Sequence, residues 1–187
     1  MSRIIENPKQ LILEKSKEIL IHEGYSKLSM RNVAKACDIA LGTIYNYYPT
    51  KKDLVMAMME GYWEEYFLLL DKIINSKRDF YVKLNDIFIN LDHFTKKFKK
   101  MWLRPEFYAT PEFVETGVER EYVYFEGLIK RFEALLISEA SKKDSAINLK
   151  LDSYETAKFI AMNFMTMIQM PFFDYLSFEK FLKQLLN

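Results

Sequence analysis

The sequence is poor in the residues that interrupt helices and crosslink chains. Its 187 residues include five glycines, five prolines and one cysteine. Because apolar residues recur mostly three or four positions apart, the pattern predicts an all-α protein. A single cysteine excludes an internal disulfide bond, and no run approaches the roughly 18 apolar residues of a membrane span. With no signal peptide visible in "MSRIIENPKQ", we expect a cytoplasmic protein that does not enter a membrane.

Patterns typical of catalysis and metal binding are also missing. His22 and His93 are the only histidines, and neither has a cysteine or carboxylate at metal-ligand spacing. There is no glycine-rich phosphate loop and no nucleophile elbow, and the carboxylates are scattered. We therefore expect no enzymatic activity, no metal site and no cofactor. Cys37 is expected to be a small buried residue rather than a redox sensor.

Charge is distributed unevenly along the chain. Residues 1–52 carry nine basic and five acidic side chains, which is +4, and the overall charge of +1 leaves −3 for residues 53–187. A basic segment on a slightly acidic body suggests a polyanionic partner for that segment. We predict two domains with the same bounds, 1–52 and 53–187.

Start and stop residues divide the N-terminal half into four helices. Asn7-Pro8 begins the first, which ends at Gly24, and Ser29 caps a short second helix. A short third helix runs from about Ala40 to Tyr48, and Thr50 with Asp53 caps a long fourth that reaches about Asn75. The predicted buried positions are Ile12, Ser16, Ile19 and Leu20; Met30, Val33, Ala34 and Cys37; and Val55, Met58, Tyr62, Tyr66, Leu69 and Ile73.

The second and third helices, joined by a tight turn, have the geometry of a helix-turn-helix. In such motifs the second helix enters the major groove of DNA. Here Gly42 allows close approach, and the side chains of Thr43, Tyr45, Asn46 and Tyr47 offer hydroxyl and amide groups for phosphates and base edges. Ile44 and Tyr48, four positions apart, are expected to face the core. The alternatives are core packing for the two other tyrosines and plain solvation for Asn46, Arg31, Lys51 and Lys52.

The stretch "GYSKLSMRNVAKACDIALGTIYNYYPTKKDL", residues 24–54, resembles the DNA-binding signature of the tetracycline-repressor (TetR) family of bacterial transcriptional regulators. The strongest part is Gly42-Thr43-Ile44-Tyr45-x-Tyr47-Tyr48-x-x-Lys51-x-x-Leu54, and the likeness covers about the first 60 residues. Three positions depart from the family pattern. Asp38 replaces a usual glycine, Ala40 replaces a serine that would cap the recognition helix, and Leu41 replaces a residue that is often polar or basic.

The resemblance implies a homodimer that puts one recognition helix of each subunit into the major groove of a double-stranded DNA operator. By that likeness Thr43, Tyr47 and Lys51 would bind phosphates. Gly42, Tyr45 and Asn46 would meet bases or adjacent backbone. Ser29 and Arg31 would bind the flanking backbone or a base.

The C-terminal half is rich in aromatic side chains and methionine. For each residue alone, core packing is the simpler interpretation, but together they suggest a cavity for a small hydrophobic or aromatic effector, which the resemblance also implies. The stretch "TKKFKKMWLR", residues 95–104, would favour an anionic effector if one basic side chain points inward, or is otherwise a solvated face. The candidate pocket residues are Tyr66, Phe88, Phe94, Phe98, Trp102, Phe107, Phe125, Phe132, Met162 and Met165.

The stretch from Thr156 to Phe173 is apolar on nearly every side and must be covered all round. A partner subunit is the simplest cover, and with the helix at 177–186 it would form a four-helix seam. A purely intramolecular core is the alternative. The candidate dimer-interface residues are Phe164, Met167, Ile168, Phe178, Phe181 and Leu182.

These expectations combine into one hypothesis. The fold is all-α with about nine helices: a three-helix helix-turn-helix domain joined by a long helix to a larger effector-binding and dimerisation domain. The function is a ligand-responsive transcriptional regulator, a repressor that a small hydrophobic effector releases from its operator. The alternatives are a helical carrier of a hydrophobic ligand without a DNA target, an activator, or a regulator that needs a co-repressor.

Overall fold

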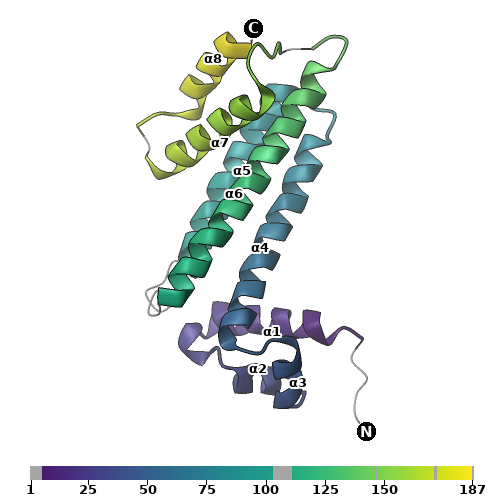
Figure 1. Ribbon diagram of the computed structural model, residues 1–187, viewed down its shortest axis with the longest axis vertical. Coiled ribbons are helices and arrows are strands. Elements are labelled where there is room, and N and C mark those ends of the chain that lie inside the picture. Colours follow the sequence, from purple (N-terminus) through teal and green to yellow (C-terminus); the bar gives the residue numbers. More distant parts are fainter. Residues whose placement is uncertain (1–5, 103–110, 146, 171, 187) are drawn as a thin grey trace. The chain divides into compact units, whose positions relative to one another are not determined.

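The computed structural model describes residues 6–102, 111–145, 147–170 and 172–186, with side chains given from Tyr122 onward in the second range. These residues form eight α-helices and one 3-10 turn, with no strand, which confirms the all-α prediction and comes close to the nine helices expected. The elements are α1 (Pro8–His22), η1 (Tyr25–Lys27), α2 (Met30–Cys37), α3 (Leu41–Tyr47), α4 (Lys51–Ile74), α5 (Phe80–Trp102), α6 (Pro111–Ala140), α7 (Ser153–Gln169) and α8 (Tyr175–Leu186) (Figure 1).

The chain divides into two compact units, and helix α4 belongs to both. The N-terminal unit includes the chain up to Glu64, and the C-terminal unit takes over at Glu65. The division therefore falls within α4, later than the predicted domain boundary at 52/53. None of the helices in the described part of the chain is long and apolar enough to span a bilayer.

Side-chain caps set the helix starts of the N-terminal unit. Asn7 and Ser29 each accept a hydrogen bond from the backbone amide three residues ahead, as predicted for the starts of α1 and α2. Thr50 and Asp53 cap each other's amides at the start of α4. The buried positions of α1 and α2 are those predicted, namely Ile12, Ser16, Ile19 and Leu20 with Met30, Val33, Ala34 and Cys37.

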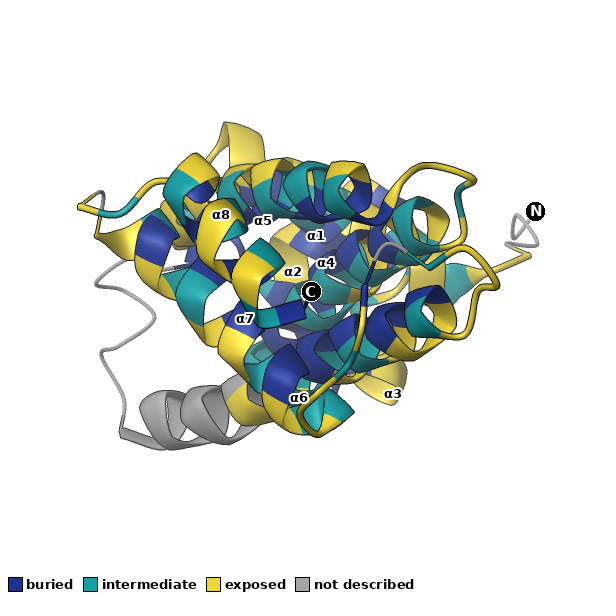
Figure 2. Ribbon diagram, turned by 90° about the horizontal axis from the view of Figure 1, so that it is seen from above, coloured by how far each residue is buried: buried dark blue, intermediate teal, exposed yellow. Residues whose placement is uncertain are grey.

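The C-terminal unit is built from the end of α4 together with α5 to α8 (Figure 1). Phe132, Phe164 and Phe178 are fully buried and fill the space where α6, α7 and α8 meet. The rings of Phe132 and Phe164 pack edge to face at 5.3 Å, as do those of Phe164 and Phe178 at 5.5 Å. Aromatic packing within the chain therefore holds α7 and α8 together and holds α7 against α6. Both helices still carry exposed residues on their other sides (Figure 2).

Two ion pairs join distant parts of the C-terminal unit. Lys83 on α5 and Glu139 on α6 are both buried, and their charged atoms lie 2.8 Å apart. Burial alone would raise the pKa of Glu139, but hydrogen bonds from Lys142 and Lys83, with their charges, hold that pKa below its ordinary value. Arg131 on α6 makes two hydrogen bonds to Asp71 on α4, at 2.8 and 3.2 Å.

Candidate nucleic-acid interface

The turn between α2 and α3 depends on a non-glycine residue in the left-handed region. Asp38 has φ 54° and ψ 45°, and its amide donates to the carbonyl of Lys35 at 3.2 Å. Aspartate tolerates this conformation better than most side chains, which explains how the turn forms without the glycine typical of the family. Ala40 then stands at the cap position of α3 and makes no side-chain hydrogen bond, as its chemistry requires.

Helix α3 separates its residues cleanly into an inner and an outer side. Ile44 is fully buried and Tyr48 is 4% exposed, so both face the core as predicted. Burial first, and then the charge of Glu60, raise the pKa of Tyr48 to about 12. Tyr45 and Tyr47, by contrast, are 47% and 41% exposed. Core packing is therefore not their arrangement in this fold.

The other predicted recognition residues are also accessible on or near α3. Gly42 and Asn46 are exposed, and Thr43 is half-buried. Arg31, on α2, is exposed. Ser29 has a structural task, because its hydroxyl oxygen accepts the amide of Asn32 at 3.1 Å and so caps α2. Its hydroxyl hydrogen can still be donated to another acceptor.

Lys51 differs from the other residues of the predicted set because its side chain already has partners. Its ammonium lies 3.3 Å from the carbonyl oxygen of Tyr25 and 3.6 Å from the centre of that tyrosine ring. Sequence reasoning did not single out Tyr25. A cation in the first turn of α4 opposes the helix dipole and needs a compensating partner. This was the signal in the sequence from which a partner for Lys51 could have been expected.

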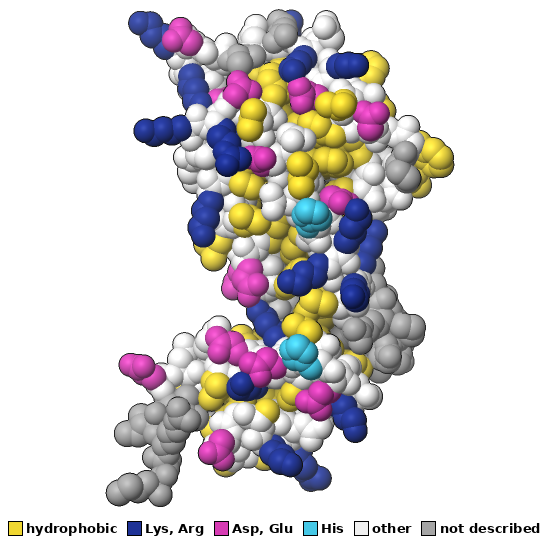
Figure 3. Space-filling view, turned by 180° about the vertical axis from the view of Figure 1, so that it is seen from behind, with side chains coloured by type: hydrophobic (Ala, Val, Ile, Leu, Met, Phe, Trp, Pro, Cys, Tyr) yellow, Lys and Arg dark blue, Asp and Glu magenta, His cyan; other side chains and the backbone are white. Residues whose placement is uncertain are grey.

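The outer side of α3 has the chemistry of a surface that reads nucleic acid. It presents hydroxyl groups, an amide and a stretch of backbone without a side chain, on a helix of groove-compatible width. Lysine and arginine side chains are visible on both parts of the molecule in Figure 3. The distribution of positive charge alone therefore does not identify the candidate nucleic-acid surface. The exposed polar side chains of α3 identify it.

The predicted effector residues fall into two aromatic groups rather than one cluster. Tyr66 stacks on Phe94 at 4.4 Å, and Phe98 continues the series of rings to Trp102 at 6.4 Å. Phe88 and Phe132 both contact the ring of Phe164 instead. The remaining members are Phe125 and Met165, which are half-buried, Met162, which is exposed, and Phe107, which lies outside the described residues.

The predicted interface residues lie mostly inside the chain's own core. Phe164, Met167, Phe178 and Leu182 are buried by intramolecular packing. A side chain with no exposed surface has nothing left to bury against a second subunit, so these four cannot be interface contacts in this conformation. Ile168 is half-buried, and Phe181 is 67% exposed. Of the six predicted interface residues, only Ile168 and Phe181 have enough exposed surface to contact a second subunit.

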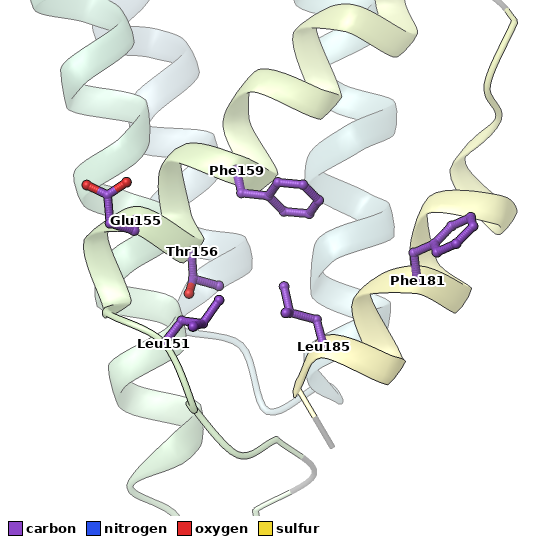
Figure 4. A pocket seen from close by; sticks show the side chains of 6 residues that line it. All are labelled: Leu151, Glu155, Thr156, Phe159, Phe181 and Leu185. Carbon is purple, nitrogen blue, oxygen red and sulfur yellow. The ribbon is translucent and has the colours of Figure 1, made fainter.

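The exposed side of α7 and α8 carries a different apolar set. A groove of about 390 Å³ lies there, lined by Leu151, Glu155, Thr156, Phe159, Phe181 and Leu185. Figure 4 shows Phe159 of α7 and Leu185 of α8 pointing into the space between the two helices. Met162, one turn along α7 from Phe159, is 55% exposed. Hydrocarbon is thus exposed on the side opposite the buried core positions.

The short helices α2 and α3 and the exposed side of α3 have the arrangement of a helix-turn-helix DNA-binding domain. A sequence model of the family described as "Bacterial regulatory proteins, tetR family" matches residues 12–58. The N-terminal segment of the chain is therefore similar to the tetR family of bacterial regulators over these residues.

Two curated relatives each match less than half of the chain. One is the HTH-type transcriptional regulator YuxN of Bacillus subtilis (strain 168), 30% identical over 73 residues, which are 39% of this chain and 24% of YuxN. The other is an HTH-type transcriptional regulator of Haemophilus influenzae, 24% identical over 86 residues, or 46% of each chain. The matched segments therefore span less than half of either relative.

Solved structures show the likeness over almost the whole chain. A transcriptional regulator from Cytophaga hutchinsonii superposes with a TM-score of 0.71 at 17% identity, covering 96% of this chain and 93% of that one. The transcriptional regulator FadR from Bacillus subtilis, crystallised in complex with stearoyl-CoA, superposes with a TM-score of 0.53 at 17% identity, covering 94% and 96%. At these identities the likeness concerns the fold alone.

Proposed function

We propose that this chain is a homodimeric repressor that binds a pseudo-palindromic operator through α3 and releases it on binding a small hydrophobic effector. The observation that carries the proposal is the two-sided character of α3. Its apolar positions, Ile44 and Tyr48, are buried, while Tyr45, Asn46 and Tyr47 are exposed with their polar groups available. An ordinary surface helix of this length would carry lysine and glutamate at such positions instead.

The exposed apolar side of α7 and α8 supports the dimer. Phe159, Met162 and Phe181 are each between 44% and 67% exposed, although each is large enough to stabilise a core. A two-fold partner that places the same side against its own copy would cover this hydrocarbon. The dimer would also hold two recognition helices about one DNA turn, roughly 34–36 Å, apart.

The aromatic content of the C-terminal unit supports a hydrophobic effector. The two groups of rings described above, around Phe94 and around Phe164, place flat apolar surfaces on α4 to α8. The related fold of FadR was crystallised with stearoyl-CoA, which is an acyl chain on an anionic carrier. We therefore name a long-chain acyl thioester as the effector class to test first. Helix α4 contributes residues to both units and is the route by which effector binding would alter operator affinity.

DNA binding is tested with a duplex that the protein itself selects from a random-sequence pool. Tyr47→Ala is expected to weaken binding to all duplexes by about tenfold, because it removes a phosphate contact. Asn46→Ala is expected to change which sequence is selected. Tyr122→Ala serves as the matched control, since Tyr122 is an exposed tyrosine of the C-terminal unit. Unchanged affinity of the Tyr47 variant, or failure of the wild-type protein to select any sequence, would contradict the proposal.

Effector release is tested on the same complex by titration with stearoyl-CoA, with free CoA and palmitate as separate additions. The expected result is dissociation of the DNA by the thioester at micromolar concentration, without dissociation by CoA. Dissociation by palmitate alone would assign the effect to the acyl chain. Persistence of the complex in all three titrations would remove this effector class from the proposal and leave the DNA-binding part untouched.

A further inference from the structure

Lys51 folds back onto a residue that precedes the helix-turn-helix. The ammonium lies within 3.3 Å of the Tyr25 carbonyl oxygen and 3.6 Å above the ring of the same residue. The two residues are 26 positions apart in sequence. One side chain therefore contacts both the backbone and the ring of a single partner.

The contact with Tyr25 compensates the ammonium of the half-buried Lys51 for the water that burial removes. Burial removes water from the group and lowers the pKa of Lys51, so the lost hydration has to be replaced by protein groups. A carbonyl oxygen and the negative face of an aromatic ring are two such groups, and both are present here. They also offset the unfavourable position of a cation in the first turn of α4.

The contact closes the chain segment that carries the recognition surface. Tyr25 begins η1, which leads through Leu28 and Ser29 directly into α2. Lys51 begins α4, directly after α3. The carbonyl of Tyr25 accepts both the amide of Leu28, at 3.1 Å, and the ammonium of Lys51. Both of its lone pairs are thereby used, and the contact joins the start of α4 to the turn that precedes α2.

We propose that Lys51 is a positioning residue that acts through Tyr25, and that it is not a ligand of a DNA phosphate. The inference rests on the proposed DNA-binding function and changes the role that the family resemblance implies for this lysine. The phosphate contacts then come from the exposed side of α3, and the Lys51–Tyr25 contact holds that side at the correct angle to the DNA.

The salt dependence of DNA binding separates the two roles. Each phosphate neutralised by a lysine contributes about 0.9 to the slope of log affinity against log salt concentration, because counterions are released. A lysine that only positions other residues contributes nothing to that slope. The expected pattern is therefore a loss of affinity without a change of slope.

The experiment measures affinity for the self-selected duplex, between about 50 and 200 mM salt, for four variants: Lys51→Met, Tyr25→Leu, the double variant and Tyr25→Phe. Each of the first two is expected to bind about tenfold more weakly with the wild-type slope. The double variant should bind no more weakly than Lys51→Met alone, because the ring contact that Tyr25→Leu removes is already lost with the ammonium. Tyr25→Phe keeps the ring and carbonyl and should bind like the wild-type protein.

Several results would overturn the proposal. If Lys51→Met lowers the slope by about one while Tyr25→Leu binds normally, the lysine is a phosphate ligand. If Tyr25→Phe binds as weakly as Tyr25→Leu, the hydroxyl group acts and the ring contact does not. If the losses disappear at a temperature where all variants are fully folded by circular dichroism, the contact only stabilises the fold. A wild-type protein that selects no duplex would instead refute the DNA-binding function itself.

Discussion

Tyr45 and Tyr47 on α3 and Phe159 and Phe181 on α7 and α8 are all large aromatic side chains with at least two fifths of their surface exposed. The first pair carries hydroxyl groups that stay hydrated in the absence of a partner and can bind phosphate in its presence. The second pair has no polar atom and gains only by leaving water. Exposed aromatic side chains therefore suit a polar partner at α3 and an apolar partner surface at α7 and α8.

The interiors of the two units differ in the polar and charged side chains that they bury. Among the residues that the structure describes, the buried charged side chains are Lys83 and Glu139, and both belong to the C-terminal unit. In the N-terminal unit the buried polar residue of the described part is Ser16. The C-terminal unit therefore holds a buried ion pair within a largely aromatic and aliphatic core, which the described part of the N-terminal unit lacks.

The largest expected effect comes from the buried charge. Glu139→Gln removes one partner of the Lys83–Glu139 pair and leaves a buried ammonium without its counter-charge. Breaking a buried pair in this way costs about 3–5 kcal/mol of unfolding free energy. Urea denaturation followed by circular dichroism measures the loss. Glu18→Gln is the matched control, because the exposed Lys15–Glu18 pair should contribute at most about 0.5 kcal/mol.

The same pair predicts the direction of acid sensitivity. The folded-state pKa of Glu139 lies below its unfolded value, so the unfolded chain takes up the proton first. The contribution of the pair is complete above the unfolded pKa and is lost as the pH falls through the folded pKa. The wild-type protein should therefore lose stability on acidification more steeply than Glu139→Gln. Equal slopes for the two proteins would show that the pair is not a source of stability.

The second effect separates the two exposed surfaces. Phe181→Glu places a charge beside the apolar groove and is expected to weaken self-association by about 100-fold or more, since an unpaired charge cannot be buried there. Sedimentation velocity at a series of concentrations measures the change. Leu68→Glu, at an exposed leucine of α4, is the control and should leave the dimer intact.

A crossed comparison makes this prediction sharper. Tyr47→Ala should leave self-association unchanged while it weakens DNA binding, and Phe181→Glu should weaken DNA binding only as far as it separates the subunits. A wild-type protein that stays monomeric at micromolar concentration, or a Phe181 variant that stays dimeric, would contradict the assignment of this surface.

The N-terminal unit could be predicted from sequence almost residue by residue, because its short helices are delimited by side chains with strong local preferences. Asn7, Ser29 and Thr50 cap the helices that they were expected to cap. The buried positions of α1 and α2 recur at helical spacing, so periodicity identified them, although Ile21 of α1 is apolar and 55% exposed. The predicted buried side of α4 is wrong by one residue toward its C-terminal end, where Leu70 is buried and the predicted Leu69 is 39% exposed.

The C-terminal unit was less predictable for a physical reason. Helix α7 is apolar on most sides. Its sequence therefore does not show which side packs in the core of the chain and which side stays exposed. The predicted set therefore mixed core residues such as Phe164 with surface residues such as Phe181. The Lys51–Tyr25 contact was missed because it joins residues far apart in sequence, and no periodicity reports such a pairing.

The smallest expected effect concerns the start of α3, where the cap residue Ala40 departs from the serine of the family pattern. Ala40 has an extended backbone, with φ −64° and ψ 141°, and lacks a side chain that could accept an amide. Ala40→Ser supplies that acceptor and should stabilise the protein by about 1 kcal/mol, or about 2–4 °C in Tm. Ala36→Ser, at an exposed position inside α2, is the control and should destabilise by a few tenths of a kcal/mol. If the two substitutions shift Tm equally, the missing cap is not a weakness of α3. If Ala40→Ser also tightens DNA binding, the fraying of α3 in the wild-type protein limits its affinity, and the polar surface is preorganised only in part.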